Sequence, residues 1–382
     1  MKCEKLFETI DALTEEYLTV WEDICNLESP TDCKAGVDAV GAYLIRLAEA
    51  RGWRTEVLPQ AVSGDCVCLT MNPEATGAPV SLSGHMDTVH PLGSFGSPAV
   101  HREGDRIYGP GVTDCKGGIV AAFLAMDALD RCGFRARPVH LLLQSDEEIS
   151  SVTSNKETVR FMVEKSRGCV AFLNCEGNNA GQLTVERKGI LRYEFAVKGR
   201  AAHSSKCSEG TNAICEAAHK ILALEKWKDA EGISCNCGVI EGGTVANTVA
   251  EECRFLADIR YRTVEQMAEV EETVRRVAET SYLPGSSCVL TEKSRRVAME
   301  RTGAVETLFR RICEIYDENG IAPVEMRMST GGSDAADMAA AGLPVVDSIG
   351  VRGGRIHSRG EYAYVESLAE AAKRLAAITY CI

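Results

Sequence analysis

Three apolar runs of strand length in this chain end abruptly at a histidine or at acidic residues. The run SLSG stops at His85, VHLLLQSD leads into Glu147 and Glu148, and CVAFLNC stops at Glu176. Short continuous apolar runs of this kind are typical of strands buried on both faces of a sheet. Because ligands of open α/β sheets bind beyond the carboxyl ends of the strands, these runs predict a site at one sheet edge.

The segments around these runs alternate between helical and extended patterns. Apolar residues recur at helical spacing over about 6–27 and 35–50, and Gly52 is placed to end the second helix. Short β-rich runs follow at 54–58 and 65–71. This alternation favours an α/β fold.

The pattern changes near residue 184 and returns near residue 295. The predicted elements between them are a strand at 189–198, a helix at 211–227, strands at 233–240 and 253–262, a helix at 264–279 and a strand at 287–290. This order predicts a small α+β insertion with an antiparallel sheet and two helices. We therefore expect a catalytic domain of residues 1–183 and 295–382 and an inserted domain of residues 184–294, and a length of 382 residues also favours two domains.

Charge and composition exclude several classes of function. The net charge of −13 argues against a nucleic-acid surface, because phosphate binding needs clustered Lys and Arg. The N-terminus is charged and amphipathic and no long uncharged apolar run follows, so we expect neither a signal peptide nor a membrane span. The seventeen cysteines are scattered through a large chain, which favours reduced thiols and a cytoplasmic location.

Five residues at predicted strand ends or tight loops offer the ligands of a catalytic metal site. They are two imidazoles and three carboxylates, from His85, Asp114, Glu148, Glu176 and His357. Zinc is bound by neutral imidazole and carboxylate, and a catalytic site keeps a position open for water. Two metals that share one carboxylate would use all five ligands, as in paired sites with metals roughly 3.5–4 Å apart.

Two further carboxylates lie next to these candidates. Asp87 comes two residues after His85, so both side chains leave an extended strand on the same face, where a carboxylate can accept the second imidazole N–H. Glu147 would point away from Glu148 and toward the substrate, as a general base requires. Taken singly, HxD at a strand end is an ordinary polar turn, and DEE is a solvated edge before a helix.

The motifs occur in one order along the chain and together resemble a known family. It is the cocatalytic zinc peptidase and deacylase family of bacterial glutamate carboxypeptidase, aminoacylase, succinyl-diaminopimelate desuccinylase and tripeptidase T, and the likeness is greatest to glutamate carboxypeptidase. The segments that carry the resemblance are SGHMDTV, YGPGVTDCKGG, DEEISS, the strand ending at Glu176, GRAAHSS, GGTVANTVAEECRFLADIR and GGSDAADMAAAGLPVVDSIGVRGGRIHS.

The resemblance implies a mixed-sheet zinc-exopeptidase catalytic domain and an inserted α+β domain that serves as a dimerisation or lid domain. It also implies two Zn²⁺ per chain, which Co²⁺ or Mn²⁺ can replace. His85 and Glu176 would hold one ion, Glu148 and His357 the other, and Asp114 would bridge them. Asp87 would orient His85, and Glu147 would take a proton from the attacking water and pass it to the leaving amine.

Residues of the inserted domain would also meet the substrate if the resemblance holds. His203 would reach the active site of the partner subunit in a homodimer, although from the residues alone it is a capping or packing histidine before a helix. Asn247 and Arg260 resemble a polar pair near the substrate, and a buried hydrogen-bonding role within the small domain is the alternative.

A third group of residues offers contacts for a substrate carboxylate. Gly331, Gly332 and Ser333 form a loop that opens a helix, whose backbone N–H groups can receive a carboxylate, and a simple flexible turn is the alternative. Arg327 lies where the glutamate carboxypeptidases have an arginine that meets the substrate carboxylate, and Arg355 is a second candidate.

The expected function is hydrolysis of an amide bond in a small peptide or N-acyl amino acid that carries a free carboxylate. An N-acyl-amino-acid deacylase or another small-molecule amidohydrolase would use the same site, and only substrate profiling separates these activities. A catalytically silent, metal-stabilised binding protein is the remaining alternative. A missing ligand or base would favour it, and none is missing from the sequence.

Overall fold

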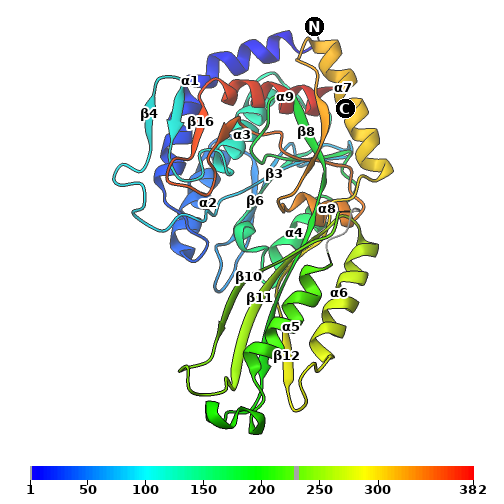
Figure 1. Cartoon of the computed structure of the whole chain (residues 1–382). Helices are drawn as coiled ribbons and strands as arrows, with labels where there is room; N and C mark the ends of the chain where they lie inside the picture. Colours follow the sequence, from blue (N-terminus) through cyan, green and yellow to red (C-terminus); the bar gives the residue numbers. More distant parts are fainter. Residues whose placement is uncertain (1, 228–231) are drawn as a thin grey trace. The chain divides into compact units, whose positions relative to one another are not determined.

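The computed structural model describes residues 2–227 and 232–382, which form two compact units (Figure 1). The first unit contains Met1–Glu186, Arg301–Met328 and Ser333–Ile382, and the second contains Arg187–Glu300 and Ser329–Gly332. The domain limits expected near residues 184 and 294 fall inside strands β8 (Gln182–Arg187) and β12 (Ser287–Arg296).

A six-stranded mixed sheet forms the centre of the first unit. Its order is β1 (Arg54–Leu58), β2 (Cys66–Met71), β6 (Val139–Gln144), β3 (Val80–His85), β7 (Ala171–Asn174) and β14 (Val345–Val346). Strands β6, β3, β7 and β14 are parallel neighbours, whereas β1 and β2 join at one edge in antiparallel pairs. The α/β class expected from the alternating patterns is therefore confirmed, as is the mixed sheet that the family resemblance implied.

Helix α3 (Lys116–Arg131) packs against β3 and β6 and between α1 (Glu4–Asn26) and α9 (Ser367–Cys381). Its sequence is apolar on nearly every side, as expected for a helix with no solvent-facing surface. Glycines allow close contact with the sheet: a Cβ at Gly118 would lie 1.8 Å from the carbonyl oxygen of Cys175. The start of α3 is thereby brought to the strand ends.

The remaining elements of the first unit were only partly visible in the sequence. Helices α2 (Lys34–Glu49), α7 (Gly303–Asn319) and α9 follow clear helical patterns, and α4 (Glu157–Lys165) and α8 (Ala335–Ala340) are shorter. The sequence patterns did not predict the two small sheets. One is β15 (Gly353–Gly354), β16 (Tyr362–Tyr364), β5 (Arg106–Tyr108) and β4 (His101–Glu103), and the other is β8 with β13 (Glu325–Ser329).

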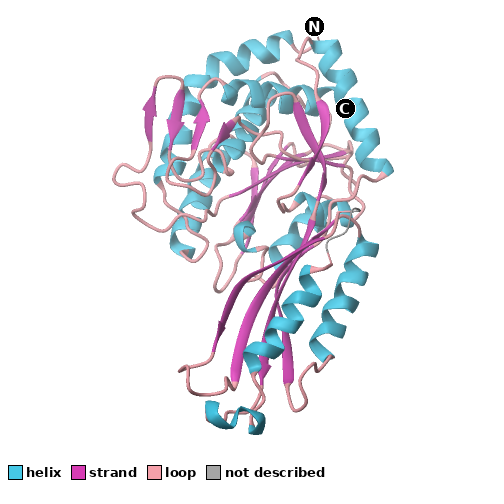
Figure 2. Cartoon of the chain, viewed as in Figure 1, coloured by secondary structure: helices cyan, strands magenta, loops and turns pink. Residues whose placement is uncertain are grey.

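The second unit is an antiparallel sheet with two helices, as the element order predicted. The sheet has the order β10 (Ser234–Gly242), β11 (Glu252–Tyr261), β9 (Gly189–Lys198) and β12, and α5 (Ala213–Glu225) and α6 (Val264–Glu279) run along it (Figure 2). The rings of Phe195 and Phe255 stack at 4.5 Å in its core. Strand β12 is longer than expected because its charged half keeps pairing with β9.

A buried ion pair fixes α5 to the end of α6. Lys220 Nζ lies 3.1 Å from Glu216 Oε1 and donates to the carbonyls of Val277 and Ala278. These carbonyls belong to the last turn of α6, where the helix itself supplies no N–H donor. Glu216 accepts from the backbone N–H of Tyr282 beyond the helix. Both charges are fully buried, so their hydrogen bonds offset the cost of removing them from water.

The structure also bears on membrane spans and disulfides. Among the described residues, no helix is both long enough and apolar enough to cross a membrane. The seventeen cysteines are all free thiols.

Asp127 on α3 is the buried centre of a polar cluster in the first unit. Its carboxylate accepts hydrogen bonds from Tyr17 Oη at 2.7 Å, Arg51 Nη2 at 2.8 Å and Arg131 Nε at 3.0 Å. Burial acts to raise the pKa of Asp127, but these donors outweigh burial and lower the pKa. A carboxylate with a lowered pKa contributes stability above its unfolded-state pKa of about 3.9, and the contribution is lost as pH falls.

We predict that Asp127→Ala lowers the free energy of unfolding by about 3 kcal/mol near neutral pH, because the partly buried Arg51 loses its nearest counter-charge and the buried hydroxyl of Tyr17 loses its acceptor. The difference between the wild-type and variant chains should shrink as pH falls below about 4. Urea denaturation at several pH values measures both effects. Asp105→Ala, at a side chain that is 74% exposed, is the control. An equal loss in the control, or a difference that grows at low pH, would contradict the account.

Candidate metal centre

The carboxyl ends of three neighbouring parallel strands meet at one edge of the mixed sheet. Strand β3 ends at His85, β6 leads into the 3₁₀ helix η1 (Glu147–Ile149), and Glu176 follows β7. His85 pairs in register with Gln144, and Ser83 with Asn174, so the residues that follow these strands emerge side by side. The site predicted at the strand ends therefore has its basis in strand direction.

Asp114 lies between two imidazoles. The residue comes just before α3, and His357 lies in the loop after β15. Asp114 Oδ1 is 3.1 Å from His85 Nε2, and Asp114 Oδ2 is 3.2 Å from His357 Nε2. Each oxygen of one carboxylate thus faces a different histidine.

Each imidazole also has its own glutamate. His85 Nε2 lies 3.6 Å from Glu176 Oε1, and His357 Nε2 lies 3.2 Å from Glu148 Oε2. The five residues therefore form two sets that share Asp114. Ligand atoms bound to one zinc at about 2.0–2.2 Å lie roughly 3.4 Å apart in a tetrahedron, so these spacings and donor types fit a pair of zinc ions.

The carboxylates and imidazoles of this cluster shift one another's pKa values. Hydrogen bonds to Asp114 and Glu148 raise the pKa of His357 to about 10. Burial acts to raise the pKa of Asp114, but hydrogen bonds from His357 and His85 lower it. Burial raises the pKa of Glu148 and Glu176, and the charge of Asp114 adds to both shifts. Such a crowded group of acids is electrostatically suited to divalent cations.

Asp87 joins the end of β3 to η1. Its fully buried carboxylate accepts hydrogen bonds from the backbone N–H groups of Glu147 at 3.1 Å and Glu148 at 3.2 Å, and from Thr31 Oγ1 at 2.8 Å. His85 Nδ1 lies 2.9 Å from the backbone oxygen of Asp87 and 3.4 Å from its carboxylate. The carbonyl is therefore the nearer partner of the imidazole, and the carboxylate mainly positions the two glutamates.

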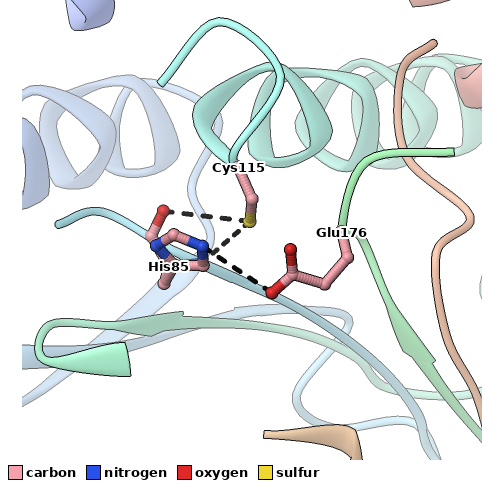
Figure 3. A group of neighbouring side chains, drawn as sticks. All are labelled: His85, Cys115 and Glu176. Atoms are coloured by element: carbon pink, nitrogen blue, oxygen red, sulfur yellow. Dashed lines mark hydrogen bonds and ion pairs between the residues drawn. The ribbon is translucent and has the colours of Figure 1, made fainter. Parts of the chain in front are cut away.

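A thiol also belongs to this cluster. Figure 3 shows Cys115, at the start of α3, beside His85 and Glu176. Its Sγ accepts the backbone N–H of His85 at 3.1 Å and lies within 4.8 Å of ligand atoms of both neighbours. Burial raises the pKa of Cys115 to about 12, so the thiol is neutral here. Its contact with the N–H of His85 joins the start of α3 to the last residue of β3.

Glu361, which no sequence motif indicated, fixes the loop before α3. Its side chain is almost fully buried and accepts the backbone N–H groups of Thr113 at 2.9 Å, Asp114 at 3.0 Å and Gly111 at 3.2 Å. His90 Nε2 lies 2.8 Å from Oε2, the oxygen that also accepts the N–H of Gly111. The only signal in the sequence was an acid placed directly before the aromatic strand YAY.

Three of the expected substrate residues, Arg327, Ser333 and Arg355, lie in the first unit. None of the contacts described for them is with the metal cluster. Ser333 is buried, and its Oγ donates to Asp347 Oδ2 at 2.8 Å and accepts from Asn174 Nδ2 at 2.8 Å. Its hydroxyl is therefore used within the fold. Arg327 lies on β13, and Arg355 lies in the exposed loop before His357.

The other expected substrate residues lie in the second unit. His203 Nδ1 accepts the backbone N–H of Ser205 at 3.2 Å and so caps the 3₁₀ helix η2 (Ser204–Glu209), while the carbonyl of Asn247 accepts the N–H of Ser204. Arg260 forms an ion pair with Asp258 at 2.6 Å.

The glycine loop is held by an arginine of the same unit. The carbonyls of Gly331 and Gly332 accept from Arg187 Nη1 at 3.1 and 3.3 Å. A Cβ at Gly332 would lie 2.5 Å from the side chain of Arg296, so the close approach favours glycine there. The loop thus makes specific contacts within its unit.

Fold and site together define a class of protein, the metal-dependent hydrolases with paired imidazole and carboxylate ligands at the edge of an α/β sheet. The model of peptidase family M20/M25/M40 matches residues 81–380, and the chain belongs to this family. The family expected from the sequence motifs is confirmed, and the chain is a hydrolase of the metallopeptidase and amidohydrolase class.

Known proteins resemble the chain over nearly its full length. Carboxypeptidase G2 from a Pseudomonas species is 27% identical over 356 residues, which cover 91% of this chain and 84% of that protein. Succinyl-diaminopimelate desuccinylase from a Bradyrhizobium species is 25% identical and covers 93% of this chain and 96% of that protein. A dinuclear metal-binding peptidase of the family from Bacillus subtilis shares the fold, with a TM-score of 0.72, 17% identity and coverage of 97% and 98%.

We predict that Glu361→Ala weakens metal binding about 10- to 100-fold, because three backbone N–H groups around Asp114 lose their acceptor. Glu361→Gln retains an amide oxygen and should recover part of the affinity. Competition with a chelator of known affinity measures the effect on the folded protein. Glu103→Ala, an exposed glutamate on β4, is the control. Unchanged affinity in folded Glu361→Ala would show that Asp114 needs no such support.

Proposed function

We propose that this protein hydrolyses an amide bond in a small substrate that carries a free carboxylate, in the manner of a glutamate carboxypeptidase. The observation that carries the proposal is the sharing of Asp114 between two imidazoles, each beside its own glutamate. The similarity to carboxypeptidase G2 over most of the chain supports the carboxypeptidase type.

The proposed cofactor is two Zn²⁺ per chain. His85 and Glu176 would hold one ion, Glu148 and His357 the other, and Asp114 both. When bound, the ions supply a Lewis acid that polarises the scissile carbonyl and lowers the pKa of water.

Glu147 is the proposed general base. Its side chain is 8% exposed, and its backbone N–H is fixed by Asp87. The carboxylate takes a proton from water as the water oxygen bonds to the scissile carbonyl carbon. It then delivers this proton to the amine nitrogen as the carbon–nitrogen bond breaks. A nearly dry position favours such a transfer, because few solvent molecules compete for the proton.

Recognition of the substrate is assigned to residues outside the ligand set. The backbone N–H groups of Gly331, Gly332 and Ser333 are the proposed contacts of the substrate carboxylate. The hydroxyl of Ser333 is bonded to Asp347, and the N–H of Gly331 would have to exchange its present acceptor, Ser329 Oγ at 3.3 Å. Arg327 or Arg355 would add the positive charge. Asn247 and Arg260 remain the proposed polar pair near the substrate.

The proposed assembly is a homodimer through the second unit, in which His203 reaches the partner subunit's active site. One observation that supports it is the edge strand β10, which among the described strands pairs only with β11 and exposes Val239 and Ile240 at 47% and 50%. Exposed apolar edge strands are surfaces on which another chain can pair. A cytoplasmic location stays a prediction.

N-acyl-amino-acid deacylation is the second candidate. It needs the same ligands and base, and the similarity to succinyl-diaminopimelate desuccinylase over the whole chain favours it. Turnover of dipeptides and N-acyl amino acids by zinc-loaded protein distinguishes the two. A silent binding protein is disfavoured because the five ligand residues and Glu147 are all present.

We predict that Glu147→Gln retains the metal content of the wild type and lowers kcat by about 10³-fold, because only the proton acceptor is removed. Glu148→Gln is the matched comparison, since this neighbour lies 3.2 Å from His357 and should lose metal. Elemental analysis and turnover of the substrate panel measure both. Full activity in Glu147→Gln, or less than about one zinc per wild-type chain, would defeat the mechanism.

A mixing experiment tests the role of His203. If His203→Ala and Glu147→Ala chains are each inactive, their heterodimers should recover part of the activity, because one of the two sites then holds both intact groups. Differently tagged chains, purified as heterodimers, give the measurement. No recovery in verified heterodimers would show that His203 does not act across the dimer.

A further inference from the structure

A pocket beside the metal centre has no role in the mechanism described so far. It lies in the first unit, has a volume of about 490 Å³ and includes the ligand Glu148 in its lining. Its apolar residues are Pro30, Val62, Val89, Pro91 and Ile149. The volume lies in the range of small-molecule sites, which are concave and largely apolar.

The walls of this pocket are built on the backbone that carries the ligands. On one side, Pro30 forms a parallel bridge with Thr88, and the hydroxyl of Thr31 donates to Asp87 at 2.8 Å. On the other side, Ile149 follows Glu148 directly in η1. The pocket is therefore fixed relative to the atoms at which hydrolysis would occur.

Several apolar side chains of the pocket are exposed to solvent, and a bound apolar group would cover them. Val62 is 68% exposed, and Val89 and Ile149 are each 39% exposed. Covering such surface with an apolar group is favourable by about 25 cal/mol per Å².

The charge of the pocket excludes the carboxylate half of the substrate. The described residues in its lining include two acids, Asp32 and Glu148, and no Lys, Arg or His. Asp32 repels a substrate carboxylate, whereas the charge of Glu148 would be offset by the ion that it holds. Because the described lining has no cationic side chain to bind a carboxylate, the pocket is left to the other side of the scissile bond.

We propose that this pocket binds the acyl half of the substrate and selects an uncharged aliphatic or aromatic acyl group over a small or an anionic one. The inference rests on the proposed function for the identity of the scissile bond. It specifies the substrate class as amides whose acyl side is apolar and whose amine side carries the carboxylate.

The test uses zinc-loaded protein and N-acetyl, N-butyryl, N-hexanoyl and N-succinyl derivatives of glutamate and of leucine. We expect kcat/KM to rise about fourfold for each added methylene until the pocket is filled. The succinyl derivative, close in length to butyryl but anionic, should be about tenfold poorer than butyryl or worse. Preference for acetyl or succinyl over butyryl would overturn the proposal.

A charge placed in the pocket should reverse this preference. Val62→Lys, at an exposed loop position, should lower the hexanoyl-to-acetyl ratio of kcat/KM about tenfold and raise the succinyl-to-butyryl ratio. Val57→Lys introduces the same change on β1, at a valine that is 42% exposed and outside the pocket, and should leave both ratios unchanged. Unchanged ratios in Val62→Lys would overturn the assignment.

Calorimetric binding to the zinc-loaded Glu147→Gln protein separates this inference from the proposed function. If no compound is turned over by the wild type, but hexanoyl derivatives bind more tightly than acetyl ones and Val62→Lys removes the difference, the pocket stands and the proposed function fails. If acetyl derivatives are hydrolysed and chain length has no effect on binding or turnover, the function stands and the pocket fails. Absence of binding by every compound counts against both.

Discussion

The carboxylate of Asp87 is the contact on which the arrangement of the site depends. It is fully buried, and it is stabilised by three donors from two segments, the N–H groups of Glu147 and Glu148 in η1 and the hydroxyl of Thr31. A buried charge is tolerated only when such donors surround it, so these segments can separate only at the cost of exposing an unsatisfied acid. One carboxylate thereby sets the distance between the end of β3 and the ligand and base that follow β6.

Glu361 has the same role for the loop that carries Asp114. There a carboxylate gathers the N–H groups around Asp114, as Asp87 gathers those of η1. Neither acid lies in the set of imidazole and carboxylate contacts that would hold the ions. Both act on backbone, which moves less than a side chain and so holds a ligand more firmly. The metal centre is thus positioned by a surrounding set of acids that fix main-chain groups.

The sequence predicted the site residues that local patterns mark and missed those whose contacts are distant in the chain. His85, Glu148 and Glu176 could be predicted as neighbours because parallel strands place their carboxyl ends together. Asp114 and His357 were candidates from their tight loops, and the family resemblance implied how the five ligands are shared between two ions. Glu361 could not be predicted, because its partners are backbone N–H groups about 250 positions away. The full length of β12 was missed for a related reason: its charged residues pair with β9, and no local pattern reports a partner. The apolar pocket likewise combines segments that look like ordinary loops in the sequence.

Gly118 has a consequence for how functional positions are recognised. A methyl group there would lie 1.8 Å from the carbonyl oxygen of Cys175, which comes immediately before Glu176. Helix α3 could accommodate that group only by moving away from β7, and Asp114 just ahead of the helix would move with it. The distance between Asp114 and Glu176 therefore depends on Gly118, a residue with no chemically reactive side chain. A survey that scores positions by the reactivity of their side chains would overlook the one that determines the dimensions of the centre.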